Sequence, residues 1–189
     1  MCSHPCRPAE REARLAPVTR VDHWPEAVRS AELMRGTLLR CGPGVRLAAW
    51  PETPRVRAAA LAPWLTPDRI AIRMVAAWVW GAARDPGRPL EFSTAGRRRP
   101  SAQRRSELVL RQYHYPEGTV VPLDGLLVTV PEQTVYDLLR SPGDFGDRQR
   151  LACRLLAQLV SGGRAGLAAR LEQQHAQFRA LARRRLAEL

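Results

Sequence analysis

The chain has 189 residues, of which 45% are hydrophobic and 25% charged, so it can bury the core of one ordinary domain with a small appendage. All 30 basic residues are arginine, and with 18 acids they give a formal charge of +12 and an isoelectric point near 11.2. The missing lysine excludes Walker-type phosphate loops, Schiff-base chemistry and kinase sites. The charge indicates a polyanionic partner, most commonly nucleic acid.

Residues 1–22 contain three prolines and little periodicity, which predicts a mobile tail. Cys2, His4 and Cys6 alternate in this tail, but no second pair of ligands completes a tetrahedral site, so we expect no metal and no cofactor. The four cysteines show no disulfide framework, no signal-type apolar stretch follows the N-terminal charges, and the longest apolar run, 75–83, is less than half a membrane span. We therefore expect a reduced, cytoplasmic protein without a membrane partner.

The region 23–65 is expected to hold a short helix at 24–34, a β-hairpin over 37–50 around Cys-Gly-Pro-Gly, and a helix at 53–62. A further helix is predicted from Pro67, after a Thr66 cap, to Gly81, which would end it. That helix would place four residues on one face: Ile70, Met74, Ala77 and Trp78.

The middle of the chain is β-rich. The pattern predicts strands at residues 89–94 and 107–115. It also predicts a hairpin over 119–130 with an Asp124-Gly125 turn. Pro131 is then expected to start a helix.

The C-terminal stretch has helical spacing over 147–160 and again over 164–189, after a pair of glycines. From Arg148 to the end, nine arginines face two glutamates, which gives +7 of the +12. We expect an α/β (α+β) fold with a small mixed or antiparallel sheet and flanking helices. A basic helical pair would end it.

Five arginines stand in nine positions between the predicted strands at 89–94 and 107–115, with no acid until Glu107: Arg97, Arg98, Arg99, Arg104 and Arg105. They would either contact a phosphate backbone or form a solvated hairpin loop. Five phosphate contacts on duplex DNA would give a slope of log affinity against log salt of roughly −4 to −5. Such contacts would position the protein without reading sequence.

Aromatic residues offer a second route to nucleic acid. Trp78 and Trp80 have the rings to stack on bases, but both adjoin an apolar helical face, and core packing is the favoured interpretation. Tyr113, His114 and Tyr115 suggest RNA contact, although alternation along a strand would let only one side of them meet a ligand.

The acidic residues do not form a catalytic pattern. Asp124 is expected to serve its turn, and Asp137 to neutralise the positive end of its helix or bind the neighbouring loop. Glu91 has no lysine after it, which argues against a nuclease core, and the scattered histidines and cysteines form no triad. We expect no enzymatic activity.

Three segments in fixed order resemble the AbiEi antitoxin family of type IV toxin–antitoxin systems, in its actinobacterial style. They are the helical stretch ending in Trp80-Gly81, the strand leading into the arginine run, and the Asp-Gly hairpin followed by a helix start. The resemblance covers roughly residues 35–160. The positions that carry it, expected to be structural, are Trp80, Gly81, Asp124, Gly125, Thr129, Pro131, Thr134, Asp137 and Leu138.

The resemblance implies a winged helix that binds promoter DNA, and a C-terminal α/β domain, here 66–189, that assists repression and opposes a nucleotidyltransferase toxin. Only one predicted helix precedes the hairpin that resembles the wing, so we expect a reduced winged-helix-like region over 23–65. Its candidate DNA contacts are Arg35, Arg40 and Arg46. Two alternatives remain: a non-enzymatic protein-interaction module, and an RNA-binding protein without operator recognition.

Overall fold

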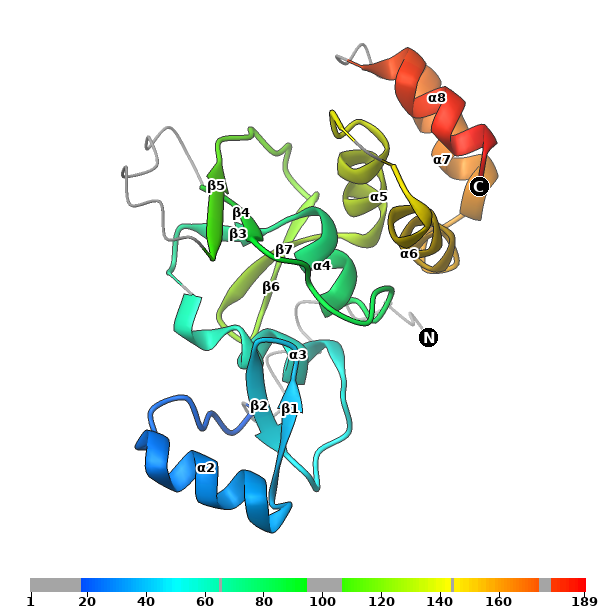
Figure 1. Cartoon of the computed structure of the whole chain (residues 1–189). Coiled ribbons are helices and arrows are strands. Elements are labelled where there is room, and N and C mark those ends of the chain that lie inside the picture. The colour runs from blue at the N-terminus through cyan, green and yellow to red at the C-terminus, as the bar shows by residue number, and fades with distance from the viewer. Residues whose placement is uncertain (1–17, 65, 95–106, 144, 174–177) are drawn as a thin grey trace, which may run out of the picture.

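The computed structural model describes residues 18–64, 66–94, 107–143, 145–173 and 178–189. In these ranges the elements are α2 (Glu26–Arg35), β1 (Leu38–Cys41), β2 (Gly44–Leu47), α3 (Pro54–Ala60), the 3-10 turn η1 (Ala62–Trp64), β3 (Arg69–Ala71), α4 (Arg73–Val79), β4 (Leu90–Thr94), β5 (Leu108–Arg111), β6 (Val120–Leu123), β7 (Leu126–Thr129), α5 (Pro131–Leu139), α6 (Asp147–Ala157), α7 (Gly163–Gln173) and α8 (Arg179–Ala187). The expected α/β class is confirmed. The unit α2–β1–β2 lies at one end of the molecule and α7–α8 at the other (Figure 1).

The N-terminal unit follows its local sequence signals. Gly36 ends α2 with φ +79°, a left-handed conformation that suits glycine. The predicted hairpin is confirmed, with β1 and β2 antiparallel and Cys41 opposite Gly44. Thr53 caps α3 by accepting the Val56 N–H at 3.3 Å.

The hairpin turn packs closely on the rest of the protein through two glycines. A Cβ on Gly44 would lie 2.2 Å from the carbonyl oxygen of Ala60, and one on Gly42 would lie 2.5 Å from the Trp78 ring. Gly42 also has φ +55°. The glycines therefore let the backbone of the hairpin approach α3 and Trp78.

One residue near the end of the predicted tail is packed against the rest of the protein. Val21 is 4% exposed, and the Trp24 N–H donates to the Val21 carbonyl at 3.2 Å. The rest of that prediction, 1–17, lies outside the described residues.

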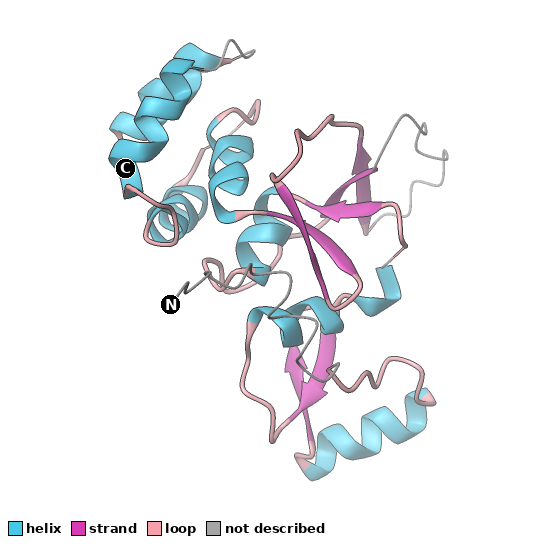
Figure 2. Cartoon of the chain, turned by 180° about the vertical axis from the view of Figure 1, so that it is seen from behind, coloured by secondary structure: helices cyan, strands magenta, loops and turns pink. Residues whose placement is uncertain are grey.

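Five strands form the central sheet in the order β5-β4-β3-β7-β6. β3 pairs with β4 antiparallel and with β7 parallel, β4 and β5 are parallel, and β6 and β7 form the predicted hairpin. Asp124 and Gly125 in its turn have φ +45° and +83°, which is the pattern of a type I′ turn. Seen from behind, the sheet and the β1–β2 hairpin are separate groups of strands (Figure 2).

The prediction of one helix from Pro67 to Gly81 is wrong in its first half. Residues 69–71 form β3, the central strand, and α4 begins only at Arg73, which has φ +49°. A short apolar stretch buried on both sides does not reveal by periodicity alone whether it is strand or helix. Ile70 is therefore not on a helical face with Met74, whereas Gly81, with φ +85°, does follow the helix end.

Two clusters of buried side chains meet at α4, all of whose residues are buried. The first joins the hairpin, α3 and the sheet, and its members include Cys41, Val56, Trp78, Phe92 and Val128. The second joins α4 to the C-terminal helices, and its members include Met74, Tyr136, Leu156, Leu167 and Leu186. Trp78 is fully buried, as its core interpretation predicts. The first cluster spans the expected boundary at residues 65 and 66.

Residues 164–189 form two helices instead of the single helical stretch that their spacing suggests. α7 ends at Gln173, and α8 begins after Phe178, which has φ +64°. With α6 this makes three C-terminal helices in the described part of the chain. No helix in that part is long and apolar enough to cross a membrane.

Candidate nucleic-acid interface

Outside the described residues lie the five arginines of the predicted phosphate-binding run: Arg97, Arg98, Arg99, Arg104 and Arg105. The strands on either side are described, and β4 and β5 pair in parallel, with Leu90 opposite Leu108. The alternative interpretation is therefore wrong in calling the connection a hairpin, because a hairpin joins antiparallel strands, while a solvated loop and phosphate contact both stay predictions for these arginines.

The three arginines predicted in the N-terminal unit differ in their surroundings. Arg35 and Arg40 are exposed, and Arg35 pairs with Glu32 at 2.5 Å. Arg40 lies opposite Val45 in the hairpin, and its side chain forms no hydrogen bond or ion pair with the described residues. Arg46 donates to the carbonyl oxygens of Trp50 at 2.6 Å and Leu47 at 3.1 Å, so it holds the strand β2 to the chain that follows.

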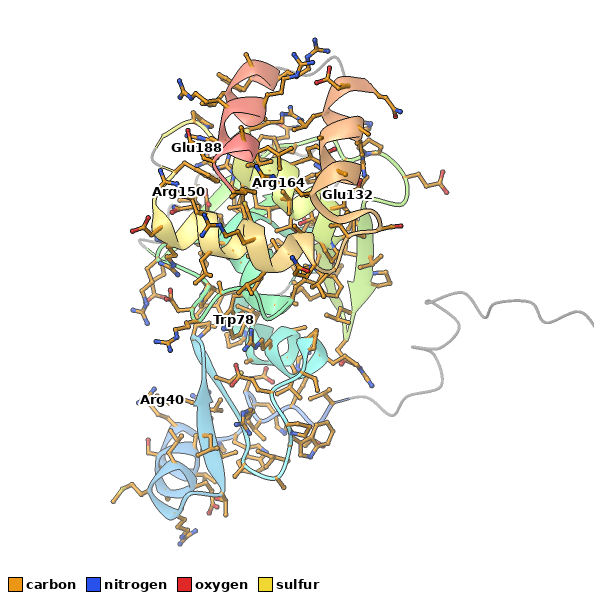
Figure 3. The ribbon with its side chains drawn as sticks, turned by 90° about the vertical axis from the view of Figure 1, so that its right-hand side faces the viewer. Arg40, Trp78, Glu132, Arg150, Arg164 and Glu188 are labelled. Carbon is orange, nitrogen blue, oxygen red and sulfur yellow. The ribbon has the colours of Figure 1, made fainter. Side chains whose placement is uncertain are left out.

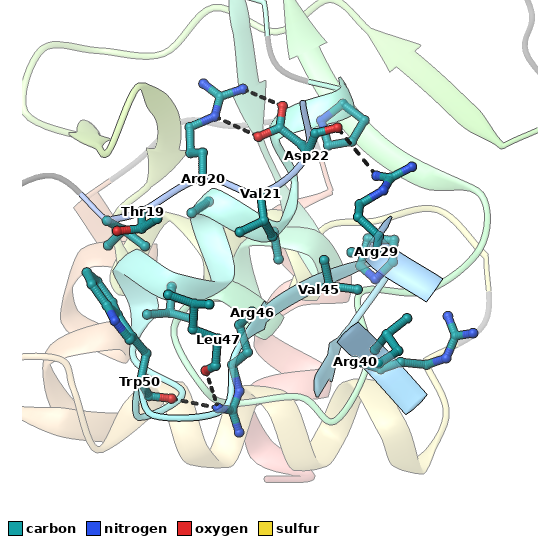
Figure 4. A pocket seen from close by; sticks show the side chains of 18 of the residues that line it. Thr19, Arg20, Val21, Asp22, Arg29, Arg40, Val45, Arg46, Leu47 and Trp50 are labelled. Carbon is teal, nitrogen blue, oxygen red and sulfur yellow. Dashed lines mark hydrogen bonds and ion pairs between the residues drawn. The ribbon is translucent and has the colours of Figure 1, made fainter. Parts of the chain in front are cut away.

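A cavity of about 280 Å³ lies between α2, the hairpin and α3 (Figure 4). Charged side chains from three segments line it: Arg20, Asp22, Glu26, Arg29, Arg40 and Arg46. Four cations therefore surround it with two carboxylates. We call this the N-terminal arginine cavity.

One carboxylate of the N-terminal arginine cavity is already engaged. Arg20 donates to both oxygens of Asp22, at 3.0 and 2.9 Å, and these hydrogen bonds hold the pKa of the carboxyl below its usual value. Arg29 donates to the Asp22 backbone carbonyl at 3.4 Å. In Figure 4, Arg29 and Arg40 lie on the side of the cavity opposite Trp50. Their positive charges are available to an anion.

Apolar and aromatic side chains complete the lining, with Trp50 and Trp64 both partly buried in the same cavity. Arginines beside aromatic rings form the pattern by which proteins hold the backbone and bases of single-stranded nucleic acid. Neither tryptophan was among the predicted site residues. The one feature of the sequence that could have indicated them is that both lie close to the predicted hairpin and to the predicted helix at 53–62.

Most other described arginines form ion pairs or hydrogen bonds within the protein. Ion pairs with acids hold several of them: Arg55 to Asp124, Arg57 to Glu52, Arg148 to Asp85, Arg170 to Glu132 and Arg183 to Glu172. The Arg185 guanidinium is buried and donates to the Leu139, Ser141 and Gly143 carbonyls. Figure 3 shows Arg150 and Arg164 among these C-terminal helices. A large part of the basic charge from Arg148 onward therefore has structural partners.

Arg73, Glu91 and Tyr113 form a buried polar cluster that the sequence did not predict. Arg73 is 5% exposed and donates to Glu91 Oε1 at 3.0 Å and to the Tyr113 hydroxyl at 2.8 Å, while its Nε has no partner in the described part. Arg111 also pairs with Glu91, at 2.9 Å. Glu91 is thus occupied by two guanidinium groups. The only sequence signal for Arg73 is an arginine inside an apolar run.

Of the two roles predicted for Asp137, neutralising the start of its helix is wrong, whereas binding a loop is confirmed, because Tyr115 lies in the loop between β5 and β6. Asp137 is the seventh residue of α5, where its carboxylate accepts from the Tyr115 hydroxyl at 2.8 Å and from Gln133 at 2.9 Å. Burial raises its pKa to about 6 against the lowering effect of those hydrogen bonds. Tyr113 and Tyr115 are thus engaged within the protein, and His114 between them is exposed.

The residues that carry the family resemblance form structural contacts between α4, β7 and α5. The Trp80 indole donates to the Thr129 carbonyl at 2.8 Å, and the Thr129 and Thr134 hydroxyls lie 2.8 Å apart. Thr134 also contacts the Val130 carbonyl at 2.9 Å, and Pro131 starts α5. Asp124 lies in the β6–β7 turn, as predicted, and also forms an ion pair with Arg55.

No group of three histidine, cysteine or acidic residues within the described ranges could hold a metal ion. Cys2, His4 and Cys6 are outside those ranges.

Comparisons with known proteins leave the family open. No protein-family model, no curated protein and no solved structure matches the chain.

Proposed function

We propose that the protein is a nucleic-acid-binding regulator of the AbiEi antitoxin kind, which binds DNA through the N-terminal arginine cavity and the Arg97–Arg105 run. The observation that carries the proposal is the meeting of four arginines with Trp50 and Trp64 in one cavity beside a helix and a hairpin. The net charge of +12 gives it a long-range attraction to a polyanion.

In this proposal Arg29, Arg35 and Arg40 contact phosphates, and Arg46 keeps the hairpin in place. Arg46 is left out of the contact set because two short hydrogen bonds to backbone carbonyls, at 2.6 and 3.1 Å, hold its guanidinium. Arg29 makes one longer hydrogen bond, at 3.4 Å, and the Arg35 side chain is 69% exposed beside its partner Glu32. Phosphate contacts fix the position of the protein, and sequence preference would come from groups that reach base edges. The regulatory role is autorepression, with opposition to a nucleotidyltransferase toxin as the second role.

The test is filter binding of the full chain to duplex DNA at several salt concentrations. We expect a steep fall of affinity with salt, a smaller slope for Arg35→Ala/Arg40→Ala, and a larger loss for Arg97→Ala/Arg98→Ala/Arg99→Ala. Arg164→Ala/Arg184→Ala is the matched control, because it removes two exposed arginines from the C-terminal helices. A flat salt response of the wild type would refute the proposal.

The cavity also gives a specific reason to test RNA, because its tryptophans suit unpaired bases better than a duplex. In competition, a single-stranded RNA that displaces the duplex at equal concentration of nucleotides would favour the RNA-binding alternative. Trp50→Ala would then weaken RNA binding more than duplex binding.

A further inference from the structure

The N-terminal arginine cavity is concave, and its volume is only about 280 Å³. That is roughly twice the 150 Å³ of an engineered cavity that holds benzene, so the unit that fits is one nucleotide and not several. In a continuous duplex the bases are stacked inside the helix, and their faces are covered. Only a nucleotide outside the stack could place its base in such a cavity.

The charges that line the cavity favour an anion. Arg20 and Asp22 pair with each other, so their charges cancel. Four charged residues remain along the lining: Arg29, Arg40, Arg46 and Glu26. Three arginines against one glutamate leave a charge of +2. Within the described part of the chain none of these three arginines forms an ion pair with a carboxylate, because Arg29 and Arg46 donate to backbone carbonyls and Arg40 has no such partner.

Positive charge and aromatic surface lie on opposite sides of the cavity. In Figure 4, Arg29 and Arg40 are on one side and Trp50 is on the other. A nucleotide has the same division, with a phosphate at one end and a flat base at the other. The cavity can therefore take the phosphate beside the arginines and the base beside the tryptophan.

The two tryptophans of the cavity are held in place through their backbones. The Trp50 N–H donates to the Leu47 carbonyl at 3.1 Å, and the Trp50 carbonyl accepts from Arg46 at 2.6 Å. The Trp64 carbonyl accepts from Arg69 at 2.7 Å. A ring on a fixed backbone loses less conformational freedom when a base stacks on it, and this preorganisation favours binding.

We propose that the N-terminal arginine cavity holds one unpaired nucleotide of DNA, with its phosphate at Arg29 and Arg40 and its base stacked on Trp50. The inference rests on the proposed function and names the substrate class, which is DNA with a nucleotide outside the stack. Phosphate contacts serve this DNA and a continuous duplex alike, whereas only the unpaired base gains the tryptophan contact. The preference between the two DNAs, and not the overall affinity, is therefore the quantity that depends on Trp50.

The probes are three fluorescein-labelled DNAs of the same sequence: a continuous duplex, the same duplex with one extra thymidine bulged from one strand, and the same bulge with an abasic residue in place of that thymidine. Fluorescence anisotropy measures the affinity of the full chain for each. The thymidine bulge should bind about tenfold more tightly than the continuous duplex, as expected for one base stacked on an aromatic ring. The abasic bulge has the same phosphates but no base, so it should bind like the continuous duplex.

Substitutions at Trp50 test which side chain reads the base. Trp50→Leu keeps an apolar side chain against the first core cluster but has no ring, so the preference for the bulge should fall to about twofold or less, whereas Trp50→Phe keeps a ring and should retain most of it. Phe178→Leu is the matched control, because it removes a 45% exposed ring beside α8 and should leave the preference unchanged. Arg40→Ala should weaken binding of all three DNAs by the same factor. Circular dichroism and thermal unfolding check that each variant is folded.

Equal affinities of the wild type for the continuous duplex and the thymidine bulge would overturn this inference and leave the proposed function standing. A preference that the abasic bulge shares, or that Trp50→Leu retains, would overturn it in the same way, because the base would then not lie on Trp50. Absence of binding to all three DNAs would overturn the proposed function as well.

Discussion

Arg55 on α3 and Asp124 in the β6–β7 turn form a two-pronged ion pair across 69 residues of sequence. The guanidinium Nε donates to Oδ2 at 2.7 Å and Nη2 donates to Oδ1 at 2.8 Å. Their side chains are only 20% and 14% exposed. This contact ties the helix that follows the N-terminal hairpin to a distant turn of the central sheet.

Loss of the guanidinium should therefore destabilise the fold. We expect Arg55→Ala to lower the free energy of unfolding by about 1–3 kcal/mol, because a charge-assisted pair loses one partner and leaves Asp124 without its main donor. Urea unfolding measures the change. Arg40→Ala, at an exposed arginine, is the control and should stay within about 0.5 kcal/mol of wild type. Equal values for both variants would contradict the structural role of the pair.

Asp137 should make stability depend on pH. Its pKa is raised to about 6 in the folded protein, mainly by burial, so the folded protein holds this proton more tightly than the unfolded chain does. The stabilising contribution is present below about pH 4 and is lost as pH rises through 6. A difference of about two pKa units corresponds to roughly 3 kcal/mol.

Asp137→Asn, which does not ionise, isolates this contribution. Between pH 4.5 and pH 7 the free energy of unfolding of the variant should improve relative to that of wild type by a substantial part of that energy, as measured by urea unfolding at each pH. A gap between the two proteins that is constant with pH would show that Asp137 does not titrate in this range.

The buried thiols should be unreactive in the folded protein. Burial raises the pKa of Cys41 to about 11 and that of Cys153 to about 12, so neither forms thiolate near neutral pH. Both are free and buried. At pH 8, iodoacetamide should label the peptides containing them only after unfolding in urea, as followed by mass spectrometry. Rapid labelling of Cys153 in the native protein would show that α6 opens.

Gly44→Ala should displace the hairpin. The new methyl group would lie 2.2 Å from the Ala60 carbonyl oxygen, a backbone atom that cannot rotate away. We expect a loss of stability of about 1–3 kcal/mol and weaker DNA binding, because the N-terminal arginine cavity lies between the hairpin and α3. Gly118→Ala is the comparison, since its Cβ would meet nothing within 4 Å and only its φ of +78° is strained. Thermal unfolding should rank Gly44→Ala as the more damaging change.

Local signals in the sequence predicted the parts of the fold that local chemistry determines. The Asp124-Gly125 turn, the Cys-Gly-Pro-Gly hairpin and the Pro131 helix start each need particular residues at particular backbone angles, and each is confirmed. The central strand β3 was read as helix because its burial comes from β4 and β7, which are distant in sequence. A local sequence pattern does not predict which distant strands will pair with β3.

The candidate site was predictable only in part. Arg40 was predicted as a DNA contact in the hairpin, and it is exposed there, whereas the role of Arg46 depends on carbonyl groups that only the folded chain brings to it. For Asp137 the loop contact was one of two predicted roles, but position in the helix does not reveal that the partner is Tyr115, 22 residues earlier. These roles depend on contacts between residues far apart in the sequence, which local patterns do not reveal.

The shared interior of the hairpin, α3 and the sheet also limits which parts of the chain could be exchanged between related proteins. Cys41 and Val56 are packed in one body with Phe92, so exchanging the first third of the chain for that of a relative would leave mismatched surfaces inside. Substitution of outward-facing residues would leave that interior intact.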